Sequence, residues 1–97
     1  MLIIVSYDIS MDSEDGPRRL RHMAKVCLNH GQRVQYSVFE CEIDNAQYLQ
    51  FRDRLLKIMD RERDSLRIYR LGNRGNEKVE HYGAKSTFKL ATDTLEI

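Results

Sequence analysis

Apolar and polar positions along the first part of the chain follow first a strand and then a helix pattern. Leu2–Ile9 is a nearly continuous apolar run rich in β-branched residues, which predicts a strand in the middle of a sheet. A polar loop follows, and Pro17 suits the first turn of a helix that Gly31 is expected to end. Between them the apolar positions have helical spacing: Leu20, Met23, Ala24, Cys27 and Leu28.

The segment Gly31–Ile43 contains apolar residues in two opposite phases. The first set occupies even positions and the second odd positions: Val34, Tyr36 and Val38, then Phe39, Cys41 and Ile43. Because side chains alternate across a strand, one buried face requires one phase. The flip therefore indicates a tight reversal between two strands or a bulge. No Asn-Gly, Asp-Gly or Pro marks a hairpin here, so both interpretations stay open.

The second half repeats the helix and strand patterns. Asp44 and Gln47 resemble a capping box that starts a second helix, whose apolar stripe is Tyr48, Phe51, Leu55 and Met59. Asp64–Gly72 and Lys78–Tyr82 read as strands, and residues 84–97 as a tail. The order predicts an α+β fold over residues 1–83: a ferredoxin-like βαββαβ unit with an additional C-terminal strand, an antiparallel sheet and two helices on one face.

Composition limits the possible partners. A chain of 97 residues has a modest core, and its uncovered sheet face would be apolar, which favours a homodimer. The net charge of +1 means that any anion site must be a local patch. Cys27 and Cys41 lack ligand spacing and suit a reducing cytoplasm. The opening apolar run is too short for a membrane span, so no membrane partner is expected.

Asp8 is the first candidate for chemistry. It stands at the end of an apolar strand, where a solvated turn carboxylate is the ordinary interpretation. The alternative is a metal ligand, because Mg²⁺ is commonly held by one or two carboxylates together with water and substrate phosphate. A two-fold axis near Asp8 would supply the second carboxylate.

Basic residues form the second candidate. Arg18, Arg21 and Lys25 share one helix face with His22, while Arg19 and Arg33 flank it. They are either a solvated face or a phosphate contact; cations near a helix N-terminus are unfavourable without an anionic partner. Ser37 and Phe39 lie at the phase flip, where Phe39 is either core or a stacking platform.

The segments VSYDI, PRRLRHMAKVC, GQRVQYSVFEC and DSLRIYRLG, in this order over Met1 to Gly83, resemble the Cas2 family of CRISPR-associated proteins. The pattern is most similar to members from type I systems of the C subtype. The resemblance implies a ferredoxin-like homodimer whose last strand, here Val79–Tyr82, crosses to the partner's sheet. It also implies a cytoplasmic endonuclease dependent on Mg²⁺ or Mn²⁺ that cleaves double-stranded DNA or single-stranded RNA during spacer acquisition.

The resemblance assigns roles to particular residues. Asp8 would bind the metal ion, one from each subunit, and Tyr7, Ser37 and Phe39 would join it in catalysis. Nucleic acid would contact the basic set: Arg18, Arg19, Arg21, Lys25 and Arg33.

The family also offers a rival role: a non-catalytic, DNA-binding dimer that bridges copies of the Cas1 integrase. Asp8 separates the two hypotheses, because only a hydrolase needs it. A regulatory ferredoxin-like dimer is a third, more distant interpretation.

Overall fold

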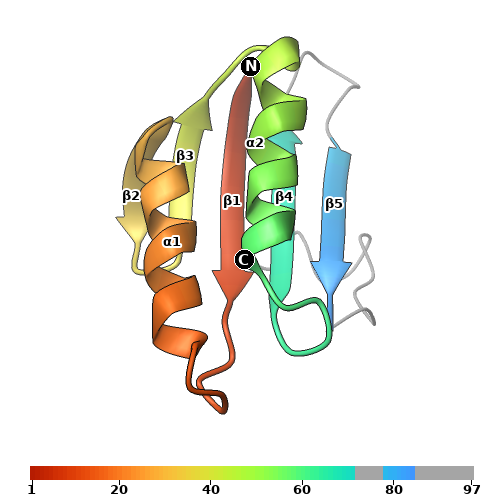
Figure 1. The fold of residues 1–97 in the computed structure, drawn as a ribbon. Coiled ribbons are helices and arrows are strands. Elements are labelled where there is room, and N and C mark those ends of the chain that lie inside the picture. Colours follow the sequence, from red (N-terminus) through yellow and green to blue (C-terminus); the bar gives the residue numbers. More distant parts are fainter. Residues whose placement is uncertain (72–77, 85–97) are drawn as a thin grey trace.

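The computed structural model describes residues 1–71 and 78–84 and arranges them as one sheet with two helices (Figure 1). The elements in chain order are β1 (Leu2–Asp8), α1 (Gly16–Leu28), β2 (Gly31–Gln35), β3 (Val38–Glu42), α2 (Asn45–Ile58), β4 (Ser65–Leu71) and β5 (Lys78–Gly83). The strands lie in the order β2-β3-β1-β4-β5, and every neighbouring pair is antiparallel. This confirms the ferredoxin-like βαββαβ unit and its additional strand. Of the predicted tail, 84–97, only Ala84 falls within the described residues.

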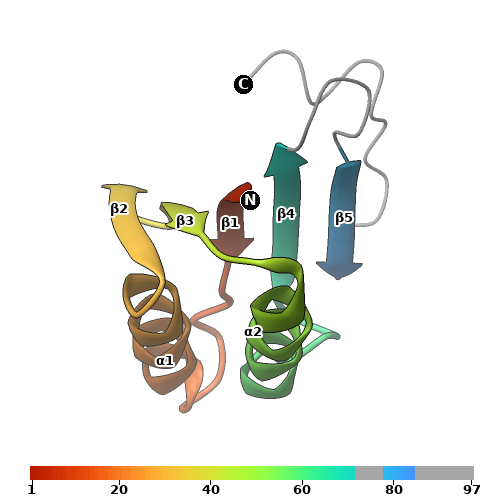
Figure 2. The same ribbon diagram turned by 90° about the horizontal axis from the view of Figure 1, so that it is seen from above.

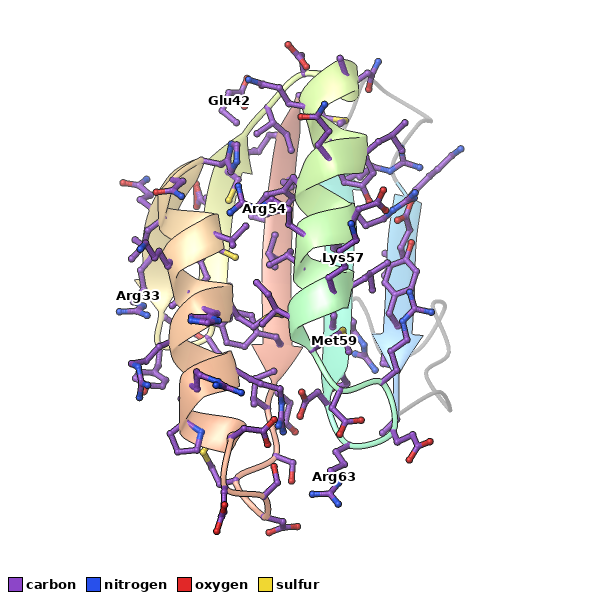
Figure 3. All side chains as sticks on the ribbon, in the orientation of Figure 1. Arg33, Glu42, Arg54, Lys57, Met59 and Arg63 are labelled. Atoms are coloured by element: carbon purple, nitrogen blue, oxygen red, sulfur yellow. The ribbon has the colours of Figure 1, made fainter. Side chains whose placement is uncertain are left out.

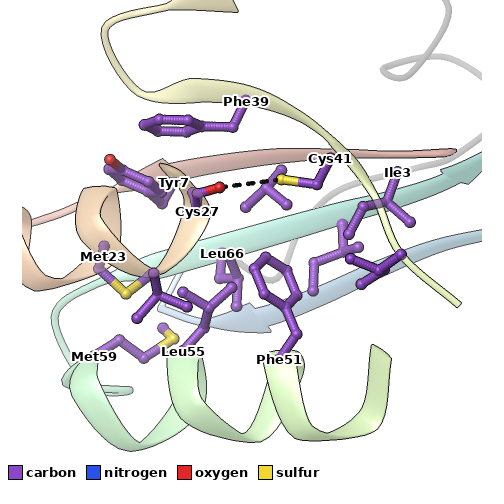
Figure 4. Packing of buried hydrophobic residues seen from close by; sticks show 14 of the residues in the cluster. Ile3, Tyr7, Met23, Cys27, Phe39, Cys41, Phe51, Leu55, Met59 and Leu66 are labelled. Atoms are coloured by element: carbon purple, nitrogen blue, oxygen red, sulfur yellow. Dashed lines mark hydrogen bonds between the residues drawn. The ribbon is translucent and has the colours of Figure 1, made fainter. Parts of the chain in front are cut away.

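The molecule has two layers, because both helices cover the same face of the sheet (Figure 2). Strand alternation sets the faces: Ile3, Val5 and Tyr7 of β1 are buried towards the helices, while Asp8 points to the other, open face. The core between the layers includes Phe51 of α2, which is only 1% exposed, and further apolar side chains from every layer element except β2 and β5 (Figure 4). Within the described ranges, no helix is long and apolar enough to cross a membrane.

The phase flip of Gly31–Ile43 has two causes acting together. β2 and β3 form a hairpin whose connection is the two residues Tyr36 and Ser37, and the β2–β3 register shifts between Arg33 and Gln35. No described residue other than glycine has a positive φ, which excludes the primed turns usual for such hairpins. The bulge adds the strand twist that an ordinary turn does not provide.

The start of α2 and the end of α1 test two of the predicted helix boundaries. The capping box at the start of α2 is confirmed: the Asp44 carboxylate accepts from the Gln47 N–H at 2.7 Å, and the Gln47 side chain accepts from the Asp44 N–H at 3.2 Å. The expectation that Gly31 ends α1 was wrong, because α1 ends at Leu28 and Gly31 begins β2. A glycine is needed at position 31 because β2 and β3 approach closely there: a Cβ on this residue would lie 1.9 Å from the Glu40 carbonyl oxygen.

β5 pairs with β4 of the same chain, from Ser65 opposite Gly83 to Arg70 opposite Lys78. Glu80 holds it on the helix side, accepting hydrogen bonds from the Tyr48 hydroxyl at 2.6 Å and the Tyr82 hydroxyl at 2.8 Å. Burial raises the pKa of Glu80, but these bonds and the nearby arginines outweigh it and hold the pKa below its usual range. The sequence predicts that Val79–Tyr82 crosses to a partner's sheet. In the single chain this segment instead forms its backbone hydrogen bonds with β4 of the same chain.

Candidate functional site

Asp8 lies exposed at the last position of β1, on the open face of the sheet. Strand pairing sets Ser65 of β4 opposite Asp8 and Arg67 opposite Ser6. These residues line a shallow pocket of about 210 Å³, which we call the Asp8 pocket; it is lined by Ser6, Tyr7, Asp8, Ser65 and Arg67. A carboxylate, two hydroxyls and a guanidinium thus meet at one end of the sheet, around a space large enough for a phosphate group and water.

The donor set of the Asp8 pocket fits half of a magnesium site. Hard cations such as Mg²⁺ prefer carboxylate and hydroxyl oxygens, and Asp8 is the only carboxylate among the residues that line the pocket. In the described part of the chain, no group of three or more His, Cys, Asp or Glu side chains could hold a metal ion. A single carboxylate among the pocket residues leaves most of the coordination shell of such an ion to water and substrate oxygens.

Tyr7 lies on the opposite side of β1 from Asp8. Its ring stacks on Phe39, with centroids 5.9 Å apart and an angle of 23° between the planes, and Phe39 is fully buried (Figure 4). Among the described residues the Tyr7 hydroxyl has no hydrogen-bond partner. Burial raises the pKa of Tyr7 to about 12, although the neighbouring Arg33 guanidinium opposes part of that rise. At neutral pH the side chain is therefore a neutral phenol.

Arg33 of β2 covers this aromatic pair from the sheet edge. Its guanidinium carbon lies 5.1 Å from the Phe39 ring centroid and 5.4 Å from that of Tyr36, which fits cation–π contacts with both rings. Ser37, in the turn beside them, accepts a hydrogen bond through its carbonyl from the Tyr7 N–H at 3.2 Å. The hairpin turn is thereby fastened to β1.

A second groove, of about 310 Å³, lies between α1 and β2 and is lined partly by Tyr7, Arg21, Lys25, Arg33 and Tyr36; we call it the Tyr7 groove. Four of the predicted site residues thus meet on the helix side of the sheet, while Asp8 stands on the open side. Arg18, Arg21 and Lys25 are all exposed on α1, which suits a phosphate contact. The structure brings the predicted residues together as two groups rather than as one site.

Arg19 is the exception among the basic residues of α1, because only 6% of it is exposed. Its Nε and Nη2 donate to the Asp64 carboxylate at 2.9 and 3.3 Å, and Nη2 also donates to the Ser10 carbonyl at 3.3 Å. Its Nη1 donates to Asp15 at 2.6 Å and to Ser13 at 3.1 Å. A guanidinium has five N–H donors, and five acceptors surround this one. Arg19 could contact a phosphate only by breaking one of these hydrogen bonds. We therefore assign Arg19 to stabilising the fold rather than to binding nucleic acid.

Asp64 is the partner that sequence reasoning missed. Its side chain is fully buried, and it also accepts from the backbone N–H groups of Ser10 at 2.9 Å and Asp60 at 2.8 Å. Burial raises the pKa of the Asp64 carboxyl, but the bonds from Arg19 and the two N–H groups outweigh it and hold the pKa below its usual range. Ser65 and Arg67 of the Asp8 pocket were missed as well, since only the pairing of β4 with β1 brings them to Asp8.

Comparison with known proteins gives one consistent result. A family model described as "CRISPR associated protein Cas2" matches residues 1–79. The "CRISPR-associated endoribonuclease Cas2" of Nitratidesulfovibrio vulgaris is 53% identical over 88 residues, which cover 91% of this chain and 86% of the relative. The "CRISPR-associated endonuclease Cas2" of Halalkalibacterium halodurans is 51% identical over 90 residues, covering 93% of this chain and 94% of the relative.

A solved structure agrees with these relatives. The crystal structure of Streptococcus pyogenes Cas2 at pH 6.5 superposes with a TM-score of 0.69 at 44% identity, covering 76% of this chain and 89% of that chain. The solved structure and the sequence relatives therefore agree on the fold and on the family. The chain belongs to the Cas2 family of CRISPR-associated proteins.

Proposed function

We propose that the protein is a divalent-metal-dependent endonuclease that acts in CRISPR spacer acquisition, with Asp8 as its metal ligand. The observation that carries the proposal is the exposed Asp8 carboxylate on the open face, beside the hydroxyls of Ser6 and Ser65 in the Asp8 pocket. The nuclease names of the relatives support the reaction class. We expect the protein to act in the cytoplasm, where the buried thiols of Cys27 and Cys41 stay reduced. We also expect it to belong with family members from type I-C systems.

The chemistry requires a second copy of the chain. One Asp8 from each subunit of a homodimer would hold a Mg²⁺ or Mn²⁺ ion. When bound, that ion activates water and offsets charge on the scissile phosphate. Ser6 and Ser65 supply hydroxyls that orient water or a phosphate oxygen in the Asp8 pocket, and Arg67 adds positive charge there, which favours an anionic substrate. Light scattering at micromolar concentration tests the dimer, and a monomer would contradict this mechanism.

The stacked rings of Tyr7 and Phe39 support this site from behind, because they are buried on the helix side of the sheet. They shape β1 just before Asp8, and the Ser37 carbonyl fixes the same strand through the Tyr7 N–H. Their predicted catalytic roles therefore amount to positioning Asp8. A Tyr7→Phe variant should keep its metal dependence and most of its cleavage rate if this view is correct.

The decisive experiment replaces Asp8 by Asn and follows cleavage of double-stranded DNA and single-stranded RNA, with Mg²⁺, Mn²⁺ or a chelator. Glu42→Gln is the matched control, because Glu42 is also an exposed carboxylate at the end of a strand. It ends β3, beside Leu2 at the start of β1, and so lies at the opposite end of β1 from Asp8 (Figure 3). We expect Asp8→Asn to abolish metal-dependent cleavage of the preferred substrate and Glu42→Gln to preserve it. Full activity of Asp8→Asn, with contaminating nuclease excluded, would refute the proposal.

A second candidate function is the non-catalytic dimer that binds DNA and bridges the Cas1 integrase. One observation favours it: the exposed cations Arg18, Arg21 and Lys25 stand on α1, on the helix side of the sheet from which Asp8 points away. Phosphate contacts by these residues do not require Asp8. If Asp8→Asn keeps DNA binding, association with Cas1 and spacer integration, the scaffold is the physiological role and cleavage is dispensable.

A further inference from the structure

A groove between α1 and α2 gathers positive charge from both helices. Its polar walls come from two residues of α1, the residue that follows α1, and two residues of α2: His22 and Lys25, then Asn29, then Arg54 and Lys57. Its volume is about 380 Å³, and we call it the helix groove. Figure 2 shows both helices on the same side of the sheet. Nothing in the nuclease proposal uses Arg54, Lys57 or His22.

The charge of the helix groove is not balanced locally. No carboxylate is among its lining residues, and within residues 1–71 and 78–84 neither Lys25, Arg54 nor Lys57 forms an ion pair. Other cations of α2 and of the loop after it are balanced: the side chain of Arg52 lies 3.8 Å from the Asp53 carboxylate, and that of Arg63 lies 3.8 Å from Asp60. Because the whole chain carries a formal net charge of only +1, three unbalanced cations around one groove are a local concentration of charge.

The shape of the helix groove selects among anions. Its floor is apolar, formed by the buried Val26 and the partly buried Ile58. Cations on two facing walls suit successive phosphates of a backbone, with a sugar over the apolar floor, better than they suit a single small anion. Lys25 also lines the Tyr7 groove, so the helix groove continues over α1 towards the predicted contacts Arg21 and Arg33.

We propose that the helix groove binds the sugar–phosphate backbone of nucleic acid, as a second contact surface on the side of the sheet opposite to the Asp8 pocket. The proposal rests on the nucleic-acid binding put forward above but not on cleavage. Since the sheet separates the two surfaces, a segment held in the helix groove is not the segment presented to Asp8 of the same protomer. The protein would then hold two segments, or one long segment that passes around its edge.

The test measures binding of a fluorescent DNA duplex at several salt concentrations, in the Asp8→Asn background and with chelator present. Arg54→Gln with Lys57→Gln removes two positive charges from the helix groove. The matched control, Arg61→Gln with Arg63→Gln, removes the same charge from the loop after α2. We expect the groove variant to flatten the slope of log affinity against log salt by about two and to weaken binding at least tenfold at about 0.1 M salt. The control variant should change the slope by less than half a unit.

Equal slopes for the groove variant and the control would overturn the proposal. So would a polyglutamate peptide that binds the unsubstituted groove as tightly as DNA and loses binding in the same variant, because the groove would then serve an acidic protein. Thermal melts of both variants exclude unfolding as the cause of a change. Failure of the nuclease proposal looks different: wild-type protein would not cleave, while the groove variant would still flatten the salt slope.

Discussion

Asp8 and Asp64 are the same residue type at the same end of the sheet, yet the fold treats them in opposite ways. Asp8 ends β1 and pairs with Ser65, which directly follows Asp64. Asp64 is fully buried on the helix side with Arg19 and two backbone N–H groups, whereas Asp8 is exposed on the open face. The difference teaches that the face of the sheet, rather than the position along it, decides whether a carboxylate is buried in the fold or exposed to solvent.

The arginines of α1 repeat the contrast. Arg19 is buried with five hydrogen bonds, while Arg18 and Arg21 on the same helix are exposed. Four experiments can break or sharpen the comparison between the buried and the exposed members of these pairs.

Asp64→Asn should have the largest effect on stability. It removes the buried carboxylate of the Arg19–Asp64 pair and leaves Arg19 only the partly exposed Asp15 carboxylate. Breaking a buried ion pair costs up to about 3–5 kcal/mol. Chemical denaturation measures the free energy of unfolding, with Asp8→Asn as the matched control on the neighbouring strand. A loss of unfolding free energy below about 1 kcal/mol would mean that the charge of Asp64 contributes little to stability beyond the hydrogen bonds that its side chain accepts from the backbone.

Acid should remove part of the same stabilisation. The pKa of Asp64 is lower in the folded chain than in the unfolded chain, so its contribution is fully present above the ordinary carboxyl pKa of about 4 and is lost as pH falls through the folded value. Glu80 acts in the same direction. Below pH 4, the free energy of unfolding of Asp64→Asn should therefore fall less steeply with pH than that of the wild type. Identical slopes would show that Asp64 is not the titrating group.

Arg18→Gln combined with Arg21→Gln should weaken duplex DNA binding about tenfold without changing stability. Each lost phosphate contact reduces the salt dependence of log affinity by about one, so the slope should flatten by about two. Arg19→Gln should do the reverse, with a large loss of stability and no specific change in slope for the protein that remains folded. An unchanged slope in the double variant would mean that α1 presents a merely solvated face.

Asp8→Asn should have the smallest effect on stability, within about 0.5 kcal/mol, because exposed substitutions seldom exceed that value. Denaturation curves of the metal-free protein provide the measurement. A large stabilisation by the substitution would indicate that the native carboxylate is held at a cost to the fold, which would itself favour a functional site at Asp8.

Local chemistry made most of the fold predictable. The apolar run of β1, the stripe of α2 and the Asp44 capping box each depend on residues close in sequence, and the structure bears each of them out. Gly31 misled, because its role is a close approach to β3 that only the pairing of β2 with β3 creates. The even-numbered apolar residues Val34 and Tyr36 misled too, being 51% and 68% exposed.

The candidate site was less predictable, because it depends on which strands become neighbours. Asp8 could be singled out as a carboxylate at a strand end, but Ser65 and Arg67 join it only through the β1–β4 register. Arg19 could not be separated from Arg18 and Arg21 by spacing. Its burial follows from Asp64, 45 residues away in the sequence, and no local pattern links the two.

The register shift in β2 also limits how copies of the chain can join. β2 is one edge of the described sheet, with all five residues exposed, and the extra residue between Arg33 and Gln35 disrupts the row of N–H and C=O groups that a foreign strand would need. β5, at the other edge, runs in unbroken register along β4. If only one edge of a sheet can pair with a strand of another copy, two copies join and assembly ends. If both edges can pair, further copies keep adding and a fibre forms. We therefore expect the irregular hairpin to disfavour strand addition at the β2 edge, and so to disfavour polymerisation of the protein through its sheet.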